Sequence, residues 1–149
     1  MTDYHNIDDI VENAFALYIT SRGGTNLKAL TVIKGAESTE ATAPHLAIVA
    51  GPCRPFIDQD PTSGDWDADV RLEVVTNLRE TARATHTALV ANLRDILVVN
   101  DLHTHMNTLS VTPLNSILWT ISELTKDVVG DCRRQGIRGV LTCNATKTA

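Results

Sequence analysis

The stretch DVRLEVVTNLRETARATHTALVANLRDIL, residues 69–97, carries the clearest pattern in the chain. Its first part alternates between apolar and polar residues, which predicts a half-buried strand over residues 70–76. Its second part repeats apolar residues at helical spacing, which predicts an amphipathic helix over residues 80–99. The apolar side of this helix comprises Ala82, His86, Leu89, Val90, Leu93, Ile96 and Leu97. A strand that leads directly into a helix is therefore the centre of the predicted fold.

Upstream of this centre, the sequence predicts a helix and two strands. Residues 4–21 form a helical apolar stripe that ends at the glycine pair 23–24. Residues 27–34 are β-like, and the apolar run HLAIVA at 45–50 is too short for a helix between its flanking proline and glycine. We interpret that run as a strand buried on both faces.

Downstream of the centre, the pattern predicts a short helical turn and two further strands. The turn covers residues 101–109, and the strands lie around residues 117–122 and over residues 137–146. Between the strands, residues 127–135 are polar and surround Gly130, so we interpret them as a turn region.

Two long loops complete the chain. Residues 36–44 are polar, and residues 51–69 combine prolines, glycines and aspartates that suit neither helix nor strand. Five of the 18 acidic residues fall between Asp58 and Asp69, which concentrates negative charge in the second loop. Loops of this length are often used for binding, and a solvated surface excursion is the alternative interpretation.

The predicted fold is a single α+β domain over residues 1–149. Two amphipathic helices cover one face of a mostly antiparallel sheet of about five strands. If the helix over residues 80–99 makes a crossover connection, the sheet is mixed instead.

Composition restricts the classes of function. Hydrophobic residues make up 43% of the 149 residues and aromatic residues 4%, so aliphatic side chains must fill the core. The net charge of −5 argues against a general affinity for nucleic-acid phosphates or anionic membranes. No apolar run approaches the ~20 residues that cross a bilayer, and the acidic N-terminus resembles no signal or transit peptide. We therefore expect a soluble, intracellular protein.

Metal and cofactor signals are weak. His103 and His105 are two residues apart, and on a helix their side chains diverge, which disfavours a shared metal ion. The three cysteines, at 53, 132 and 143, are odd in number and lack the close spacing of a zinc site, so we expect free thiols. The sequence predicts neither a metal nor a cofactor.

Catalytic signals are also weak. No GxSxG motif is present, and the glycine pair 23–24 follows a predicted helix instead of preceding one, so it is no phosphate cradle. His86, on the apolar side of a helix, is interpreted as a packed core histidine. Arg133, Arg134 and Arg138 form the basic cluster of the chain, which is either a solvated turn or a patch that pairs with an acidic neighbour. We expect no enzymatic activity and no catalytic residues.

Residues 69–97 resemble the strand-then-helix core of tail-completion proteins of tailed bacteriophages, the tail-terminator or neck family. The resemblance lies in the turn at Thr76-Asn77, the helical histidine His86 and the run Ala88-Leu89-Val90. The order of the flanking elements is also similar: TVIKG at 31–35, PHLAIVA at 44–50, ILWTIS at 117–122 and RGVLTCNA at 138–145.

This resemblance implies a structural virion protein. Proteins of this kind form a ring, usually a homohexamer, that terminates the tail tube and joins it to the head–tail connector. The implied partners are other copies of the chain, the tail tube protein and a connector or head-closure protein, with genomic DNA passing through the lumen without specific binding. The implied location is the virion neck, with the host cytoplasm during assembly, and no membrane is involved.

The candidate interface combines the acidic loop with the basic cluster. Its residues are Asp58, Asp60, Asp65, Trp66, Asp67, Arg133 and Arg134. Trp66 is the expected anchor, because tryptophan is enriched at interface hot spots. A head-closure or connector protein and a cytoplasmic small-molecule-binding module are the alternatives, and an enzyme built around His86, the cysteines or the acidic loop is a further one.

Overall fold

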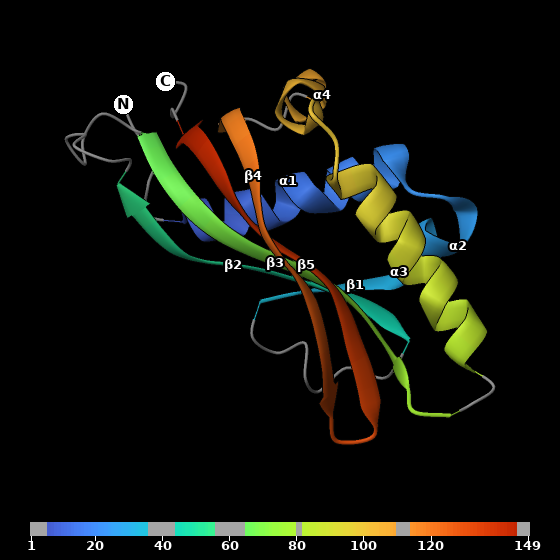
Figure 1. The fold of residues 1–149 in the computed structure, drawn as a ribbon. Coiled ribbons are helices and arrows are strands. Elements are labelled where there is room, and N and C mark those ends of the chain that lie inside the picture. Colours follow the sequence, from blue (N-terminus) through green and yellow to red (C-terminus); the bar gives the residue numbers. More distant parts are fainter. Residues whose placement is uncertain (1–5, 36–43, 56–64, 80–81, 110–113, 146–149) are drawn as a thin grey trace.

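A computed structural model describes residues 6–35, 44–55, 65–79, 82–109 and 114–145 (Figure 1). The helices are α1 (Ile7–Arg22), α2 (Thr25–Lys28), α3 (Arg83–Leu97) and α4 (Leu102–Thr108). The strands are β1 (Thr31–Lys34), β2 (His45–Pro55), β3 (Asp65–Asn77), β4 (Leu114–Val129) and β5 (Cys132–Ala145). None of the helices in these ranges is long and apolar enough to cross a membrane.

The strands of the described ranges form one mixed sheet of five strands in the order β1-β2-β3-β5-β4. β1 pairs with β2 in parallel, and every other neighbouring pair is antiparallel. The prediction of an α+β fold with a mostly antiparallel or mixed sheet of about five strands is confirmed.

The four helices of the described chain lie on one face of the sheet (Figure 1). α1 packs against β2, α3 against β3 and β5, and α4 against β4. Because side chains alternate along a strand, Leu72 and Val74 of β3 enter the core under these helices, where both are fully buried. The expected packing of amphipathic helices on one face is confirmed.

Trp119 joins β4 to the helical layer. Its ring lies over Gly139 of β5, where an added Cβ would come within 2.5 Å of the ring. The indole Nε1 donates a hydrogen bond to the Leu97 carbonyl at the end of α3, 2.9 Å away. On its other side the ring contacts Phe15 of α1, with centroids 5.1 Å apart. In a chain with few aromatic residues, this side chain ties three elements together.

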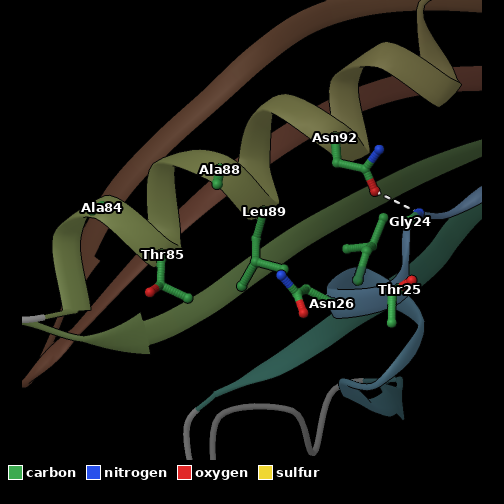
Figure 2. A pocket seen from close by; sticks show the side chains of 9 residues that line it. Gly24, Thr25, Asn26, Ala84, Thr85, Ala88, Leu89 and Asn92 are labelled. Carbon is green, nitrogen blue, oxygen red and sulfur yellow. Dashed lines mark hydrogen bonds between the residues drawn. The ribbon is translucent and has the colours of Figure 1, made fainter.

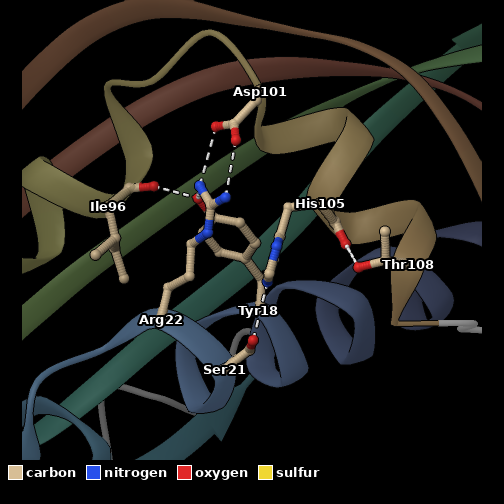
Figure 3. A network of polar contacts seen from close by, with 7 residues as sticks. All are labelled: Tyr18, Ser21, Arg22, Ile96, Asp101, His105 and Thr108. Carbon is tan, nitrogen blue, oxygen red and sulfur yellow. Dashed lines mark hydrogen bonds and ion pairs between the residues drawn. The ribbon is translucent and has the colours of Figure 1, made fainter.

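A polar network joins α1 to the segment between α3 and α4 (Figure 3). Arg22 pairs with both carboxylate oxygens of Asp101, at 3.0 and 2.9 Å, and also donates to the Tyr18 hydroxyl. Tyr18 in turn donates to the Ile96 carbonyl, and Ser21 bonds to His105 of α4. The Arg22 guanidinium lowers the pKa of Asp101. These contacts fix the connection between the helices.

The structure corrects the long loop predicted over residues 51–69. β2 continues to Pro55 and β3 begins at Asp65, so only residues 56–64 lie outside the described strands. β2 accommodates its glycine and proline through a register shift between Ala50 and Cys53. The predicted loop at 36–44 lies almost entirely outside the described residues.

The predicted turn region at 127–135 is also wrong. β4 continues to Val129, and β5 already begins at Cys132. Gly130 occupies a left-handed conformation (φ 59°) in the tight turn between the two strands. The two strands are therefore much longer than the alternation predicts. A strand was predicted over residues 27–34, but its first residues end helix α2 instead. The helical turn predicted over residues 101–109 is confirmed as α4.

Gly136 tests the pairing of β3 with β5. A Cβ on this residue would lie 1.9 Å from the Leu72 carbonyl oxygen, and this neighbour is backbone in a buried strand and cannot move aside. We predict that Gly136→Ala lowers the free energy of unfolding by about 2 kcal/mol or more. Urea denaturation measures this loss, with exposed Thr120→Ala of β4 as the control. An unchanged midpoint for Gly136→Ala would contradict the described register.

Candidate functional site

The structure does not bring the predicted interface residues together. Asp58 and Asp60 lie outside the described residues, and Asp65, Trp66 and Asp67 begin β3. Trp66 stands opposite Cys143 in the register, whereas Arg133 stands opposite Thr76. Ten residues of β3 separate these positions, a distance of roughly 33 Å along the strand. The acidic and basic groups therefore occupy opposite ends of the sheet.

Trp66 belongs to a strand and not to the loop predicted over residues 51–69. It lies within β3 between Pro55 of β2 and Cys143 of β5. Its side chain is half-buried and packs against the hydrophobic core. The strand was not predicted here because aspartates on both sides of the tryptophan are typical of a loop.

The aspartates at the start of β3 bond to neighbouring strands. Asp65 accepts a hydrogen bond from the Asn144 amide at 2.9 Å, and Asp67 accepts one from the Thr142 hydroxyl at 2.7 Å. Both partners lie on β5. The side-chain bonds between strands explain how an acidic sequence forms part of a regular sheet.

A chain of ion pairs crosses the sheet face opposite the helices. Arg54 of β2 pairs with Asp69 of β3 at 3.0 Å, and Arg138 of β5 lies 4.0 Å from the same carboxylate. Arg138 also pairs with Glu123 of β4 at 3.6 Å. The hydrogen bond that Asp69 accepts from Arg54 is the main reason that the pKa of Asp69 is lowered. The charges on this face are thus largely matched within the chain.

Arg134 belongs to a second matched group and not to a solvated turn. Its side chain is nearly buried and lies 3.4 Å from Glu73, which also pairs with Arg71 at 3.3 Å. The Thr125 hydroxyl donates to the same carboxylate at 3.0 Å. Arg134 therefore stabilises the sheet, and its predicted role as an interface residue finds no support in its position.

Arg133 faces the other side of the sheet, as the alternation of strand side chains requires. It lies in a cavity of about 460 Å³ between α3 and the hairpin of β4 and β5. We call this cavity the basic groove. Its lining residues are Arg83, His86, Thr87, Val90, Ala91, Arg94, Lys126, Arg133 and Gln135.

His86 forms the buried wall of the basic groove. Its Nδ1 lies 2.8 Å from the Thr76 hydroxyl, and its Nε2 lies 3.1 Å from Oε1 of Gln135. A neutral ring that accepts from the hydroxyl and donates to the amide oxygen satisfies both contacts. Burial is the main cause of a lowered pKa for His86, and the charges of Arg133 and Lys126 lower this pKa further. The interpretation as a packed, hydrogen-bonded histidine agrees with this position.

The outer edge of β4 is a long free strand edge of the described sheet. β4 ends the sheet order, and α4 contacts it near Ser116, where Asn107 bonds to the Ser116 backbone. The β4–β5 hairpin projects at its turn (Figure 1), and residues 122–129 of β4 are exposed apart from half-buried Thr125. Leu124 and Val128 are 58% and 57% exposed there. This edge was not predicted from the sequence, although apolar residues inside a predicted polar turn were an available signal.

A second cavity, of about 430 Å³, lies between α2 and α3 (Figure 2). Small neutral side chains such as Thr25, Ala84 and Ala88 line it. Asn92 points across from α3, and its Oδ1 accepts a hydrogen bond from the Gly24 backbone at 2.8 Å. Among the described residues, no charged side chain lines this cavity, so it offers shape but little chemistry.

The described residues contain no group of three or more His, Cys, Asp and Glu side chains that could hold a metal ion. Burial raises the pKa of the Cys53 thiol to about 11 and that of Cys143 to about 12. Both thiols are therefore protonated at neutral pH, and a protonated thiol is a poor nucleophile. The cysteines are free, as expected.

His86 makes the stability of the protein depend on pH. Because its pKa in the folded protein lies below 6.5, the unfolded chain binds a proton at higher pH than the folded chain does. This contribution to stability is present above pH 6.5 and is lost as the pH falls through the folded pKa. Thermal unfolding between about pH 8 and 5 measures it.

We predict that acidification lowers the Tm of the wild type more than that of His86→Gln. The comparison with the variant is necessary because the pKa of buried Glu12 is raised, so that its titration has the opposite effect on stability. Parallel pH profiles for the two proteins would contradict the neutral state of His86.

No protein-family model matches this chain, and no curated protein matches its sequence.

Proposed function

We propose that this chain is a structural subunit that assembles with copies of itself into a ring, in the role of a tail-terminator protein of a tailed bacteriophage. In this role the ring ends the tail tube and joins it to the head–tail connector. The observation that carries the proposal is the projecting, exposed part of β4 over residues 122–129. Ring order, tail tube and connector come from the resemblance to the terminator family.

An exposed strand edge presents unpaired backbone groups that another chain can pair with. β4 has 16 residues, and the part beyond α4 is accessible along its edge. The apolar side chains of Leu124 and Val128 lie on this part, where water contacts more than half of each. Pairing with a neighbouring copy would bury these side chains and would also give the backbone groups of the edge hydrogen-bond partners.

The two edges of the sheet favour a head-to-tail contact. The opposite edge, β1, has only four residues, so it presents a different surface from β4. When a long edge meets a different surface on the next copy, each subunit uses both surfaces once. Repetition of this contact closes into a ring if the rotation between copies allows it.

The matched charges on the sheet face also suit a structural role. Asp69, Arg138 and Glu123 link strands to one another. Such cross-strand pairs stiffen a sheet, and a stiff sheet can hold the hairpin in place while it contacts a neighbour.

A small-molecule-binding module is the second candidate, because cavities of about 430 and 460 Å³ fall within the size range of ligand pockets. A head-closure or connector protein would use the same edge against a different partner. A thermal-shift screen with metabolites distinguishes the small-molecule-binding module from the ring subunit. A rise of several degrees with one compound would favour the binding module.

We predict that the double substitution Leu124→Lys/Val128→Lys prevents ring formation. Two charges on the β4 edge oppose burial of that edge, while the buried core stays unchanged. Native mass spectrometry, with and without the tail tube protein, measures the oligomer. Leu17→Lys is the matched control, because Leu17 is 48% exposed on α1 and far from the hairpin.

The control should assemble like the wild type, and the double variant should remain monomeric. A wild type that is monomeric both alone and with tail tubes would overturn the proposed function. A two-fold dimer through β4 would overturn the ring, although it would retain the edge as an interface.

A further inference from the structure

We propose that the basic groove binds an acidic segment of a partner protein, through carboxylates that meet the cations of α3 and the β4–β5 hairpin. The proposal adds a second contact surface to the β4 edge and does not depend on ring formation. It rests on unmatched charge, an unsatisfied donor and the apolar surroundings of the groove.

Three cations of the groove, Arg94, Lys126 and Arg133, lack the acidic partners that other cations in the described chain have. Arg94 donates from Nε to the Gly136 carbonyl and from a terminal nitrogen to the Thr125 carbonyl, both at 3.1 Å. Arg133 donates to the Arg79 carbonyl at 3.3 Å. Carbonyl groups orient a guanidinium but leave its charge uncompensated. In the described chain, neither these arginines nor Lys126 form an ion pair with a carboxylate.

The contrast with the rest of the chain is clear. Outside the groove, arginines on α1 and on strands β2, β3 and β5 pair with carboxylates within 4.0 Å: Arg22, Arg54, Arg71, Arg134 and Arg138. The net charge of the chain is −5, so acids are in excess overall. Among the described residues, the lining of the groove includes cations and no carboxylate, which is a local departure from the charge balance of the protein.

Arg133 also holds an unused hydrogen-bond donor. Its Nη1 is buried and has no hydrogen-bond partner. A buried donor without an acceptor costs about 1–3 kcal/mol. A carboxylate that enters the groove can supply this acceptor after a rotation of the arginine side chain, and charge-assisted bonds of this kind are the stronger ones.

The shape and lining favour a peptide over a nucleic acid. Val90 and Ala91 contribute apolar surface to the groove. Leu124 and Val128 stand on the same sheet face, because they pair with Ile137 and Arg133 in the β5 register. Among the described residues, no aromatic side chain other than the buried His86 lines the groove, so bases find no exposed platform for stacking there. An acidic segment that also carries leucine matches both the charge and the apolar surface.

Fluorescence anisotropy tests the proposal on the full chain. The probe is a labelled synthetic peptide of alternating glutamate pairs and leucines, and the reference is the same peptide with glutamine in place of glutamate. A labelled single-stranded oligonucleotide is the third probe. We expect saturable binding of the glutamate peptide and at least tenfold weaker binding of the glutamine peptide.

Two variants locate the site. Lys126→Glu reverses a charge on the hairpin wall, and Thr87→Glu adds a carboxylate on the α3 wall, away from the β4 edge. Each should weaken binding of the glutamate peptide at least tenfold, whereas Lys28→Glu, on exposed α2, should not. Because Thr87 lies on α3 and not on β4, Thr87→Glu should lose the peptide while the oligomer measured by native mass spectrometry is unchanged.

Absence of binding, equal binding of the two peptides, or equal loss in Lys28→Glu would overturn the proposal. Tighter binding of the oligonucleotide than of the glutamate peptide would also overturn it, in favour of a nucleic-acid site. A ring that persists in the Leu124→Lys/Val128→Lys variant, together with binding of the glutamate peptide, would refute the proposed function alone.

Discussion

β3 and β5 pair over thirteen positions in one uninterrupted register, from Asp65 opposite Asn144 to Asn77 opposite Cys132. A slip of one residue would exchange the two faces of a strand and expose Leu72 and Val74, which are fully buried. The close approach of the strands at Gly136, where the Leu72 carbonyl leaves no room for a Cβ, also favours this register. The positions of the helices, the ion pairs and the projecting hairpin all follow from this pairing.

The register separates two neighbouring arginines into different roles. Arg134 turns to the face opposite the helices and pairs with Glu73, where it stabilises the sheet. Arg133 turns to the helical face and lines the basic groove. A linear sequence shows these residues as one basic cluster. The sheet converts that cluster into one structural charge and one charge that is available to a ligand.

Local patterns were sufficient to predict much of the fold. Alternation over residues 70–76 and helical spacing over residues 80–99 predicted β3 and α3, because each pattern lies within one element. The strand positions of Asp65 and Asp67 could not be predicted in this way, because their bonds to Asn144 and Thr142 join residues 79 and 75 positions apart. Of the predicted site residues that the structure describes, Arg133 alone lines a groove. The β4 edge was missed because strand order is a property of the whole sheet.

The central claim is that the free edge of β4 becomes the contact between copies. Hydrogen–deuterium exchange of the backbone amides over residues 122–129 tests this claim most directly, when it is compared between the free subunit and the assembled ring. The account predicts strong protection of these amides on assembly, because edge pairing gives outward-facing N–H groups an acceptor. Unchanged exchange along this segment in the assembled protein would contradict the account.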